Sequence, residues 1–268
     1  MSDDSGARLR ELYESQGGVG AVFSTKVAHY VASRPNYPAA LFERLSGLGV
    51  LPPNAAVADI GAGTGVLTRD LLARGHSVVA VEPSDEMRAA ADRLLGAHPR
   101  YRSVAGTAEA STLAPQSVDL ITAAQAFHWF DIEPAQRECL RILRPHGQVA
   151  LIWNDRVLAD PLHVALDAVF AEFGGARRGA MRVHEERTPV PQFFGGPPAQ
   201  SIDLPHEHRL SCDGLVSLAF SRSYMPALSG DAGLSARRRV EAVFAQHAEG
   251  DSVVVRYRCV AFMFQPLG

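Results

Sequence analysis

The chain has 268 residues, a formal net charge of −3 and a hydrophobic fraction of 47%. That length suits one large α/β domain or one domain with a small cap, and the hydrophobic fraction is typical of a folded protein. The small net charge gives no electrostatic basis for binding nucleic acid or a membrane surface. Three scattered cysteines form neither a disulfide framework nor a metal motif. We therefore expect a cytoplasmic protein without a metal site.

The sequence also lacks targeting and anchoring segments. It starts Met-Ser-Asp-Asp, which is acidic and is followed by no apolar core segment, so we expect no signal peptide. No apolar run approaches the roughly 20 residues that are needed to cross a bilayer. These features predict a protein with no membrane partner, and they leave its oligomeric state, monomer or homodimer, open.

Residues 1–50 are expected to form N-terminal helices and a lid. Tyr30 and Arg34 lie four residues apart and so share one face of a helix. Two prolines then end that helix, because proline cannot continue a helix interior. Apolar residues at helical spacing predict a further helix over residues 39–48.

Strands and helices alternate between residues 51 and 154. The strands are nearly continuous apolar runs, which is typical of parallel strands that helices cover on both faces. The predicted fold class is therefore α/β, with a doubly wound, mostly parallel sheet. A turn at Pro145-His-Gly147 leads into the last strand of this part. The predicted strands cover residues 56–60, 77–81, 101–105, 118–122 and 148–153, and the predicted helices cover 66–73, 85–95 and 133–142.

Beyond residue 154 this alternation stops. A helix is predicted over residues 158–173, and the Gly-, Pro- and Arg-rich residues 174–200 show little periodicity. We expect residues 155–198 to form a cap inserted over the carboxyl edge of the sheet, where α/β proteins bind ligands. Residues 199–268 should complete the sheet, with strands at 199–210 and 252–264 and helices at 213–221 and 233–248.

Residues 56–65 read Ala-Val-Ala-Asp-Ile-Gly-Ala-Gly-Thr-Gly, which predicts a buried strand that ends in a glycine turn. Glycine has no Cβ, so a ligand can lie directly against this backbone. A dinucleotide fingerprint requires a third small residue where this chain has Val66. Asp59, just before the turn, suits a ligand with an ammonium group rather than a diphosphate. The pattern favours S-adenosylmethionine (SAM) over NAD, so an NAD-dependent oxidoreductase is the less favoured alternative.

Glu82 lies 21 positions after Gly61, at the end of the second predicted strand. A carboxylate there can accept hydrogen bonds from both hydroxyls of a ribose, as in dinucleotide-binding folds. Pro83 and Met87 follow, and they could supply an apolar wall for adenine. Together with the glycine turn, Glu82 predicts a site for a ligand that carries a ribose.

Five successive segments resemble the motifs of class I SAM-dependent methyltransferases: residues 57–65, 78–83, 104–109, 118–131 and 142–154. Three motifs are similar to a small-molecule branch that includes trans-aconitate methyltransferase-like proteins: Tyr30-x-x-x-Arg34-Pro-x-Tyr-Pro38, Ala124-Gln-Ala-Phe-His-Trp-Phe-Asp131 and Ser221-x-Ser-Tyr224. The resemblance covers most of residues 25–264 and implies a Rossmann-like sheet of seven strands. It also implies an enzyme that transfers a methyl group from SAM to an O, N or C atom of a small molecule and releases S-adenosylhomocysteine (SAH).

The resemblance further implies which residues hold the cofactor. The loop at residues 107–109 would read the adenine edge, and Gln125 and Ala126 would lie beside the methionine arm. Tyr30 and Arg34 would close over the cofactor, and Arg34 could pair with its carboxylate. The complete predicted cofactor site is Tyr30, Arg34, Asp59, Gly61, Ala62, Gly63, Gly65, Glu82, Pro83, Met87, Thr107, Ala108, Glu109, Gln125 and Ala126.

His128 is the candidate catalytic residue. It follows the fourth predicted strand, on the rim where the transferred methyl group should sit. An imidazole can accept a proton from a hydroxyl or an amine near neutral pH. The alternative is that His128 only shapes the pocket. For the chain as a whole, the alternative is a SAM-binding protein that does not methylate, such as a cyclase or a regulator.

The acceptor is expected to contact the inserted cap and the late helices. Lys26 is the only lysine, which indicates a GC-rich genome and suggests a specialised metabolite as the acceptor. Aromatic residues could wall an apolar acceptor, and arginines could bind an acidic one. The aromatic candidates are Phe170, Phe173, Phe193, Phe194 and Tyr224, and the arginine candidates are Arg177, Arg178, Arg182 and Arg187.

Overall fold

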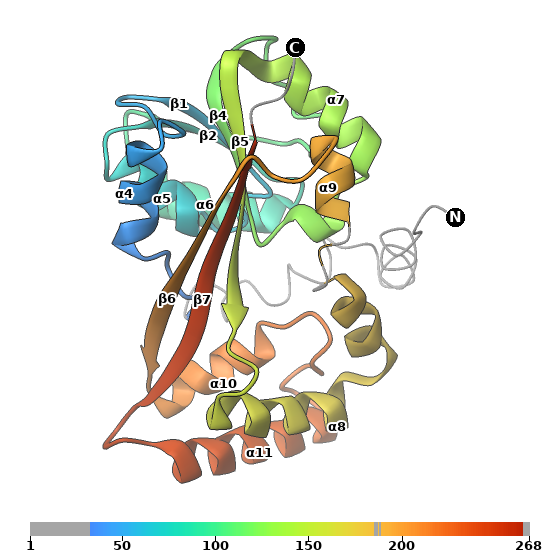
Figure 1. Ribbon diagram of the computed structural model, residues 1–268. Coiled ribbons are helices and arrows are strands. Elements are labelled where there is room, and N and C mark those ends of the chain that lie inside the picture. Colours follow the sequence, from blue (N-terminus) through green and yellow to red (C-terminus); the bar gives the residue numbers. More distant parts are fainter. Residues whose placement is uncertain (1–32, 185–186, 188, 265–268) are drawn as a thin grey trace. The chain divides into compact units, whose positions relative to one another are not determined.

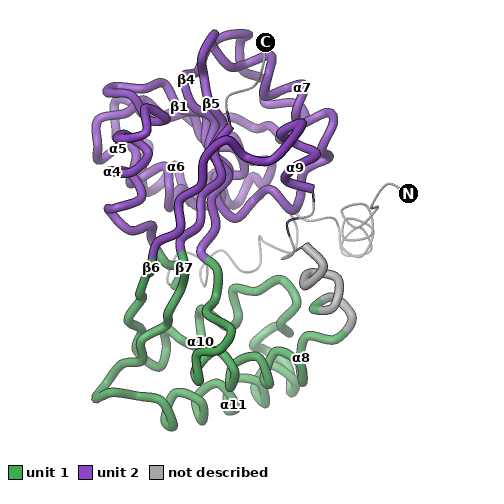
Figure 2. The backbone as a smooth tube through the Cα atoms, in the orientation of Figure 1, with its two compact units in different colours: residues 1–35, 155–186, 205–258 green, residues 36–154, 187–204, 259–268 purple. Residues whose placement is uncertain are grey.

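The computed structural model describes residues 33–184, 187 and 189–264 (Figure 1). The chain divides into two compact units, which Figure 2 shows in different colours. The described residues of unit 1 are 33–35, 155–184 and 205–258, and those of unit 2 are 36–154, 187, 189–204 and 259–264. One division between the units falls between Asn154 and Asp155. The division into lid, core, cap and C-terminal part that the sequence suggests stays a prediction.

The chain forms a seven-stranded sheet, of which β1 to β4 lie wholly in unit 2 and β5, β6 and β7 lie partly in unit 1. Its strands lie in the order β3-β2-β1-β4-β5-β7-β6, and β1 to β5 pair in parallel. The sheet is mostly parallel with one antiparallel hairpin, which confirms the predicted fold class. The strands are β1 (Ala56–Ile60), β2 (Ser77–Val81), β3 (Tyr101–Val104), β4 (Val118–Ala124), β5 (Leu143–Arg156), β6 (Gln200–Leu210) and β7 (Val253–Phe264).

Alternate residues of the central strands face two separate apolar clusters. In β4, Leu120 belongs to one cluster and Ile121 to the other. In β5, Ile152 belongs to the cluster of Leu120, and Leu151 belongs to the cluster of Ile121. Because successive side chains of a strand point to opposite faces, this division shows that the sheet is buried on both faces. The strand ends that carry the predicted site residues therefore rest on a rigid support.

Helices cover both clusters. Leucines of α4 and α5 pack in the cluster that contains Leu120, whereas α7 and α9 contribute to the cluster that contains Ile121. The helical segments of unit 2 are α4 (Ala39–Gly47), α5 (Val66–Leu72), α6 (Asp85–Leu95), η1 (Phe127–Trp129), α7 (Ile132–Ile142) and α9 (Pro189–Phe194).

Unit 1 has an apolar core of its own. Its helices are α8 (Pro161–His184), α10 (Cys212–Phe220) and α11 (Asp231–His247). One cluster joins Phe170 of α8, Phe220 of α10 and Val240 of α11, and it includes Tyr257 from the part of β7 in this unit. In the part of the chain that the structure describes, no helix has both the length and the apolar character that crossing a membrane requires.

Helices lie within residues 174–200, where the sequence shows little periodicity and no helix was predicted. The helix α8 continues to His184, with a break in helical geometry at Gly175 (φ 55°, ψ −151°), and α9 follows. Both helices contain residues that usually interrupt helices. Proline is tolerated in a first helical turn, as in α9, which begins Pro-Val-Pro. The glycine pair in α8 breaks the helix geometry locally, and the chain then becomes helical again.

The start of β5 also differs from the prediction. The turn expected at Pro145-His-Gly147 lies inside β5, which begins at Leu143. The pairing with β4 shifts here, from Leu143 opposite Val118 to Gln148 opposite Leu120. The extra residues form a bulge in a continuous strand.

Candidate functional site

Four neighbouring strands carry the predicted site residues at their ends. The glycine turn follows β1, Glu82 follows β2, residues 106–109 follow β3 and Gln125 follows β4. These strands are adjacent and parallel, so their carboxyl ends lie at one edge of the sheet. Residues that are distant in sequence are thereby collected at the edge where α/β proteins bind ligands.

The glycine turn is closed on one side and open on the other. A Cβ built on Gly61 would lie 2.5 Å from the Cβ of Ala126, so the turn presses directly against the segment after β4. Gly63 has a φ of +56°, which disfavours other residues, and a Cβ built there meets no described atom within 4 Å. Ala62 lies between them, and Gly65 is the N-cap of α5. The backbone at Gly63 can therefore be approached closely by a ligand.

Glu82 contacts this turn. Its Oε2 accepts a hydrogen bond from the Gly63 N–H (N···O 2.9 Å), and its Oε1 accepts one from the Ser84 N–H (N···O 2.9 Å). Burial raises the pKa of Glu82, and these two N–H groups act in the opposite direction. A carboxylate oxygen has more than one acceptor position, so Glu82 can hold the turn and still accept from hydroxyl groups.

Asp59 lies beneath the turn and is 1% exposed. Its two carboxylate oxygens accept hydrogen bonds from the hydroxyls of Thr68 (O···O 2.7 Å) and Thr122 (O···O 2.9 Å). Burial raises the pKa of Asp59 to about 6, and the nearby charge of Glu82 adds to this effect. Two acidic groups with raised pKa values thus lie close together, an arrangement that favours a cationic ligand.

The segment after β4 is fixed by its aromatic residues. The Gln125 N–H donates to the carbonyl oxygen of Ile152 (N···O 2.9 Å), although Gln125 has a φ of +56°. Phe127 is buried, with its ring centroid 5.2 Å from that of Phe193 and 6.2 Å from that of Trp153. His128 follows and is half-buried. The burial of Phe127 therefore positions His128 at the strand end.

The remaining predicted residues have different placements. Met87 is buried on α6, where its N–H donates to the Ser84 hydroxyl, and Pro83 is exposed. Tyr30 lies outside the described residues. Arg34 belongs to unit 1, whereas the glycine turn belongs to unit 2.

The comparisons with known proteins agree with this geometry. Residues 58–151 match a family model described as a methyltransferase domain. An uncharacterized methyltransferase of Mycobacterium tuberculosis is 34% identical over 226 residues, which cover 84% of this chain and 86% of that protein. The chain belongs to the class I SAM-dependent methyltransferases. This family assignment removes the NAD-dependent oxidoreductase from the alternatives.

Two further similarities support the assignment. A protein of Saccharomyces cerevisiae named as a probable S-adenosylmethionine-dependent methyltransferase is 31% identical over 128 residues, or 46% of this chain and 43% of that protein. A solved methyltransferase-type structure from Anaeromyxobacter dehalogenans has a TM-score of 0.64 and 25% identity, and the match covers 87% of this chain and 98% of that one. The methyltransferase fold therefore extends well beyond the segment that the family model matches.

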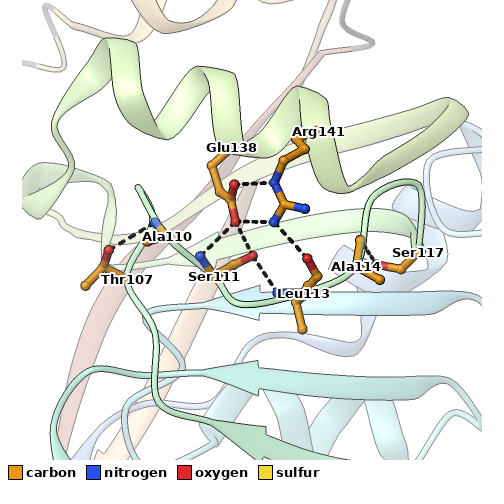
Figure 3. A network of polar contacts seen from close by, with 8 residues as sticks. All are labelled: Thr107, Ala110, Ser111, Leu113, Ala114, Ser117, Glu138 and Arg141. Atoms are coloured by element: carbon orange, nitrogen blue, oxygen red, sulfur yellow. Dashed lines mark hydrogen bonds and ion pairs between the residues drawn. The ribbon is translucent and has the colours of Figure 1, made fainter.

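A polar network that the sequence analysis missed fixes the loop after β3 of this methyltransferase (Figure 3). The Ser111 N–H and hydroxyl donate to Oε1 of Glu138 on α7, at 2.8 and 2.5 Å. Arg141, one helical turn further on, donates to both oxygens of Glu138 and to the carbonyl oxygen of Leu113, each at 2.7 Å. The bonds from Arg141, followed by those from Ser111, lower the pKa of Glu138 to about 2, although burial opposes them.

The same loop carries the predicted adenine contacts. The Thr107 hydroxyl accepts from the Ala110 N–H (N···O 3.2 Å), and Ala108 is buried. Oε1 of Glu109 accepts from the N–H of Asp131, at the start of α7 (N···O 2.8 Å). The loop is thus tied to both ends of α7. In the sequence, the spacing of Glu138 and Arg141 indicates an ion pair on α7 but gives no sign of the loop that it holds.

Replacement of Asp59 by Asn should change how stability depends on pH. The folded-state pKa of about 6 lies above the ordinary 3.8, so the protonated carboxyl stabilises the fold below pH 4, and this contribution is lost as pH rises through 6. Urea unfolding measures the free energy of unfolding of both proteins. Relative to wild type, that of Asp59→Asn should rise by about 2–3 kcal/mol between pH 4 and pH 7. A difference that stays constant over this range would contradict the assignment.

Replacement of Glu138 by Gln should weaken the fold at neutral pH. The folded-state pKa of about 2 lies below the ordinary 4.5, so the ionised carboxylate stabilises the fold above pH 4.5, and this contribution is lost as pH falls toward 2. We expect a loss of about 2 kcal/mol in the free energy of unfolding at pH 7, because Arg141 is partly solvent-screened. The exposed Arg137→Gln on the same helix is the control and should change little.

Proposed function

We propose that the protein transfers the methyl group of SAM to an O, N or C atom of a small molecule. The observation that carries this proposal is the pairing of Glu82 with the open glycine turn, above the buried Asp59. A fitting ligand lies against backbone, offers hydroxyl donors to one carboxylate and carries positive charge near the other. SAM has a ribose, a sulfonium and an ammonium group, so the two carboxylates and the open backbone at this edge fit it.

The proposed cofactor contacts follow from this fit. Glu82 would accept from the ribose hydroxyls, the backbone of residues 61–65 would lie along the ribose and methionine portions, and the charge of Asp59 would favour the ammonium group. When bound, SAM supplies a methyl group activated by its sulfonium charge. The protein's own contribution is alignment and the exclusion of water, and alignment of two reacting groups can lower a barrier by about 7–11 kcal/mol.

The other predicted residues enter as part of the same proposal. The adenine would contact Pro83, Met87, Thr107, Ala108 and Glu109, and the methionine arm would contact Gln125 and Ala126. Tyr30 and Arg34 are proposed to close over the cofactor on the resemblance alone. His128, half-buried after β4, would accept a proton from the attacking group of the acceptor. A specialised metabolite remains the proposed acceptor class, and a cytoplasmic location the proposed compartment.

Calorimetric titration with SAM, followed by incubation with candidate acceptors and detection of SAH, tests this function. Binding of SAM and acceptor-dependent release of SAH would support it. Binding of SAM with no SAH from any acceptor would favour a cyclase or a regulator. Absence of SAM binding would overturn the proposal.

Replacement of Glu82 by Ala should weaken the binding of SAM by about 1–3 kcal/mol, because hydrogen bonds to a charged group are lost. Calorimetry measures this change, and Glu82→Gln, which keeps one acceptor oxygen, should fall between the variant and wild type. Glu133→Ala, which removes an exposed carboxylate from the first turn of α7, serves as the control. Equal SAM affinity of Glu82→Ala and wild type would exclude Glu82 from the cofactor site.

Replacement of His128 by Ala should lower kcat about 10²–10⁴-fold while SAM affinity stays the same, if the imidazole acts as a base. Its rate profile should also lose the dependence on pH near neutrality that a histidine base gives. Turnover kinetics across pH 5.5–8.5, with SAM binding measured in parallel, separate the roles. Loss of SAM affinity would instead show that His128 shapes the pocket.

A further inference from the structure

Two arginines of unit 1 lie over one aromatic ring. Cζ of Arg222, just after α10, is 4.9 Å from the ring centroid of Phe170 on α8, and Cζ of Arg156, at the end of β5, is 5.8 Å from the same centroid. The Arg156 side chain is 9% exposed. Cation–π contact holds both guanidinium groups against the ring. Little water reaches Arg156, whereas Arg222 is half-buried. Positive charge is therefore concentrated beside this ring.

One of these arginines, Arg156, shares an acidic partner with a third arginine. Oδ1 of Asp167, also on α8, lies 3.4 Å from Nη1 of Arg156. Its Oδ2 lies 2.6 Å from Nη2 of Arg178. One carboxylate thus serves two guanidinium groups. A guanidinium group carries five N–H donors, so an arginine that already has a partner can also bind an anionic ligand.

Tyr257 supplies the second, independent observation. It is 4% exposed, and its hydroxyl has no hydrogen-bond partner among the residues that the structure describes. Buried hydroxyls nearly always have partners, so one without a partner is a candidate ligand contact. Burial raises the pKa of Tyr257, and the charges of Arg222, Arg34 and Arg156 act in the opposite direction. The Val157 N–H also donates to the carbonyl oxygen of Arg256 (N···O 3.4 Å), so the segments that carry Arg156 and Tyr257 lie side by side.

The Tyr257 ring is held on two sides. The His163 ring packs edge-on against it, with centroids 5.7 Å apart, and the His206 ring lies 6.3 Å away. His163 is fixed in turn by a 2.7 Å hydrogen bond from Nε2 to the carbonyl oxygen of Arg256. The unpartnered hydroxyl is thus presented in a fixed position, which is typical of a preorganised binding site.

We propose that Arg156, Arg222 and Tyr257 form a binding site in unit 1 for an oxyanion group, a carboxylate or a phosphate, of a small molecule other than the cofactor. Guanidinium groups and a phenol are donors, and oxyanions are acceptors that match them. The arginines predicted from the sequence differ from these: Arg178 pairs with Asp167, and Arg187 lies over Trp153 in unit 2. That the bound molecule is the methyl acceptor rests on the proposed function, whereas oxyanion binding does not.

Calorimetric titration of the full chain with succinate and with methyl phosphate, at low ionic strength and with saturating SAH, tests the site. At least one of the two anions should bind, the stronger one identifies the oxyanion class, and the uncharged succinamide should not bind. Arg222→Gln should weaken anion binding about tenfold or more. Arg238→Gln makes the same charge change at an exposed position of α11 and should leave anion binding as in wild type.

Tyr257→Phe separates binding from folding. It removes only the hydroxyl, which has no described partner to lose, so the Tm without anion should not fall. Anion binding should weaken about threefold to tenfold. A lower Tm with unchanged anion affinity would show a structural role only and would overturn the proposal, as would equal anion affinity of wild type and Arg222→Gln.

A final titration tests whether the carboxylate of the cofactor itself binds at this site. SAH and 5′-methylthioadenosine, which lacks the amino-acid portion, are titrated into wild type and Arg222→Gln. Equal SAH affinity in both proteins supports a separate ligand. An SAH affinity that falls in the variant, with 5′-methylthioadenosine unchanged, assigns the site to the cofactor and overturns the proposal. Failure of SAH to bind wild type would count against the proposed function alone, because the anion titration can be repeated without SAH.

Discussion

The fold of this methyltransferase depends on one constraint, the burial of the Asp59 carboxylate under the glycine turn. Asp59 ends up inside the sheet because β1 continues to Ile60 before the backbone turns. Its oxygens bind the hydroxyls of Thr68 on α5 and Thr122 on β4, so three elements meet at one acidic group. Such a group is unfavourable in an apolar interior unless it is hydrogen-bonded or faces positive charge. The two threonines satisfy the first condition, and a cationic ligand at the turn would satisfy the second.

The features around Asp59 support one another. Gly61 lets the turn approach Ala126 closely, which brings the segment after β4 against the segment after β1. Glu82 then bonds Gly63 from the other neighbouring strand. The loop after β3 is held separately, through Glu138 and Ser111, and this network does not involve the turn. The site edge is therefore held by two sets of contacts, one around the glycine turn and its acids and one between the loop after β3 and α7.

The sequence was sufficient for features that depend on local pattern. The ranges of β1, β2 and α6 agree with the predictions, because apolar runs and helical spacing are local, and the glycine turn follows from its residue types. Features that depend on distant partners could not be predicted. The bonds of Glu138 join positions 27 residues apart, and Arg222 and Arg156 meet on Phe170 only in the folded chain. The helices over residues 174–200 were missed because glycine and proline suggest breaks wherever they occur.

The burial of Asp59 links cofactor binding to stability. On the proposed function, the apoprotein holds an acidic group whose ionisation is suppressed, and binding of a cation would draw out its proton. Binding that favours only the folded state also raises the free energy of unfolding, with the logarithm of the ligand concentration once that exceeds the Kd. The lifetime of the folded polypeptide, and not just its turnover rate, would then follow the methyl-donor concentration.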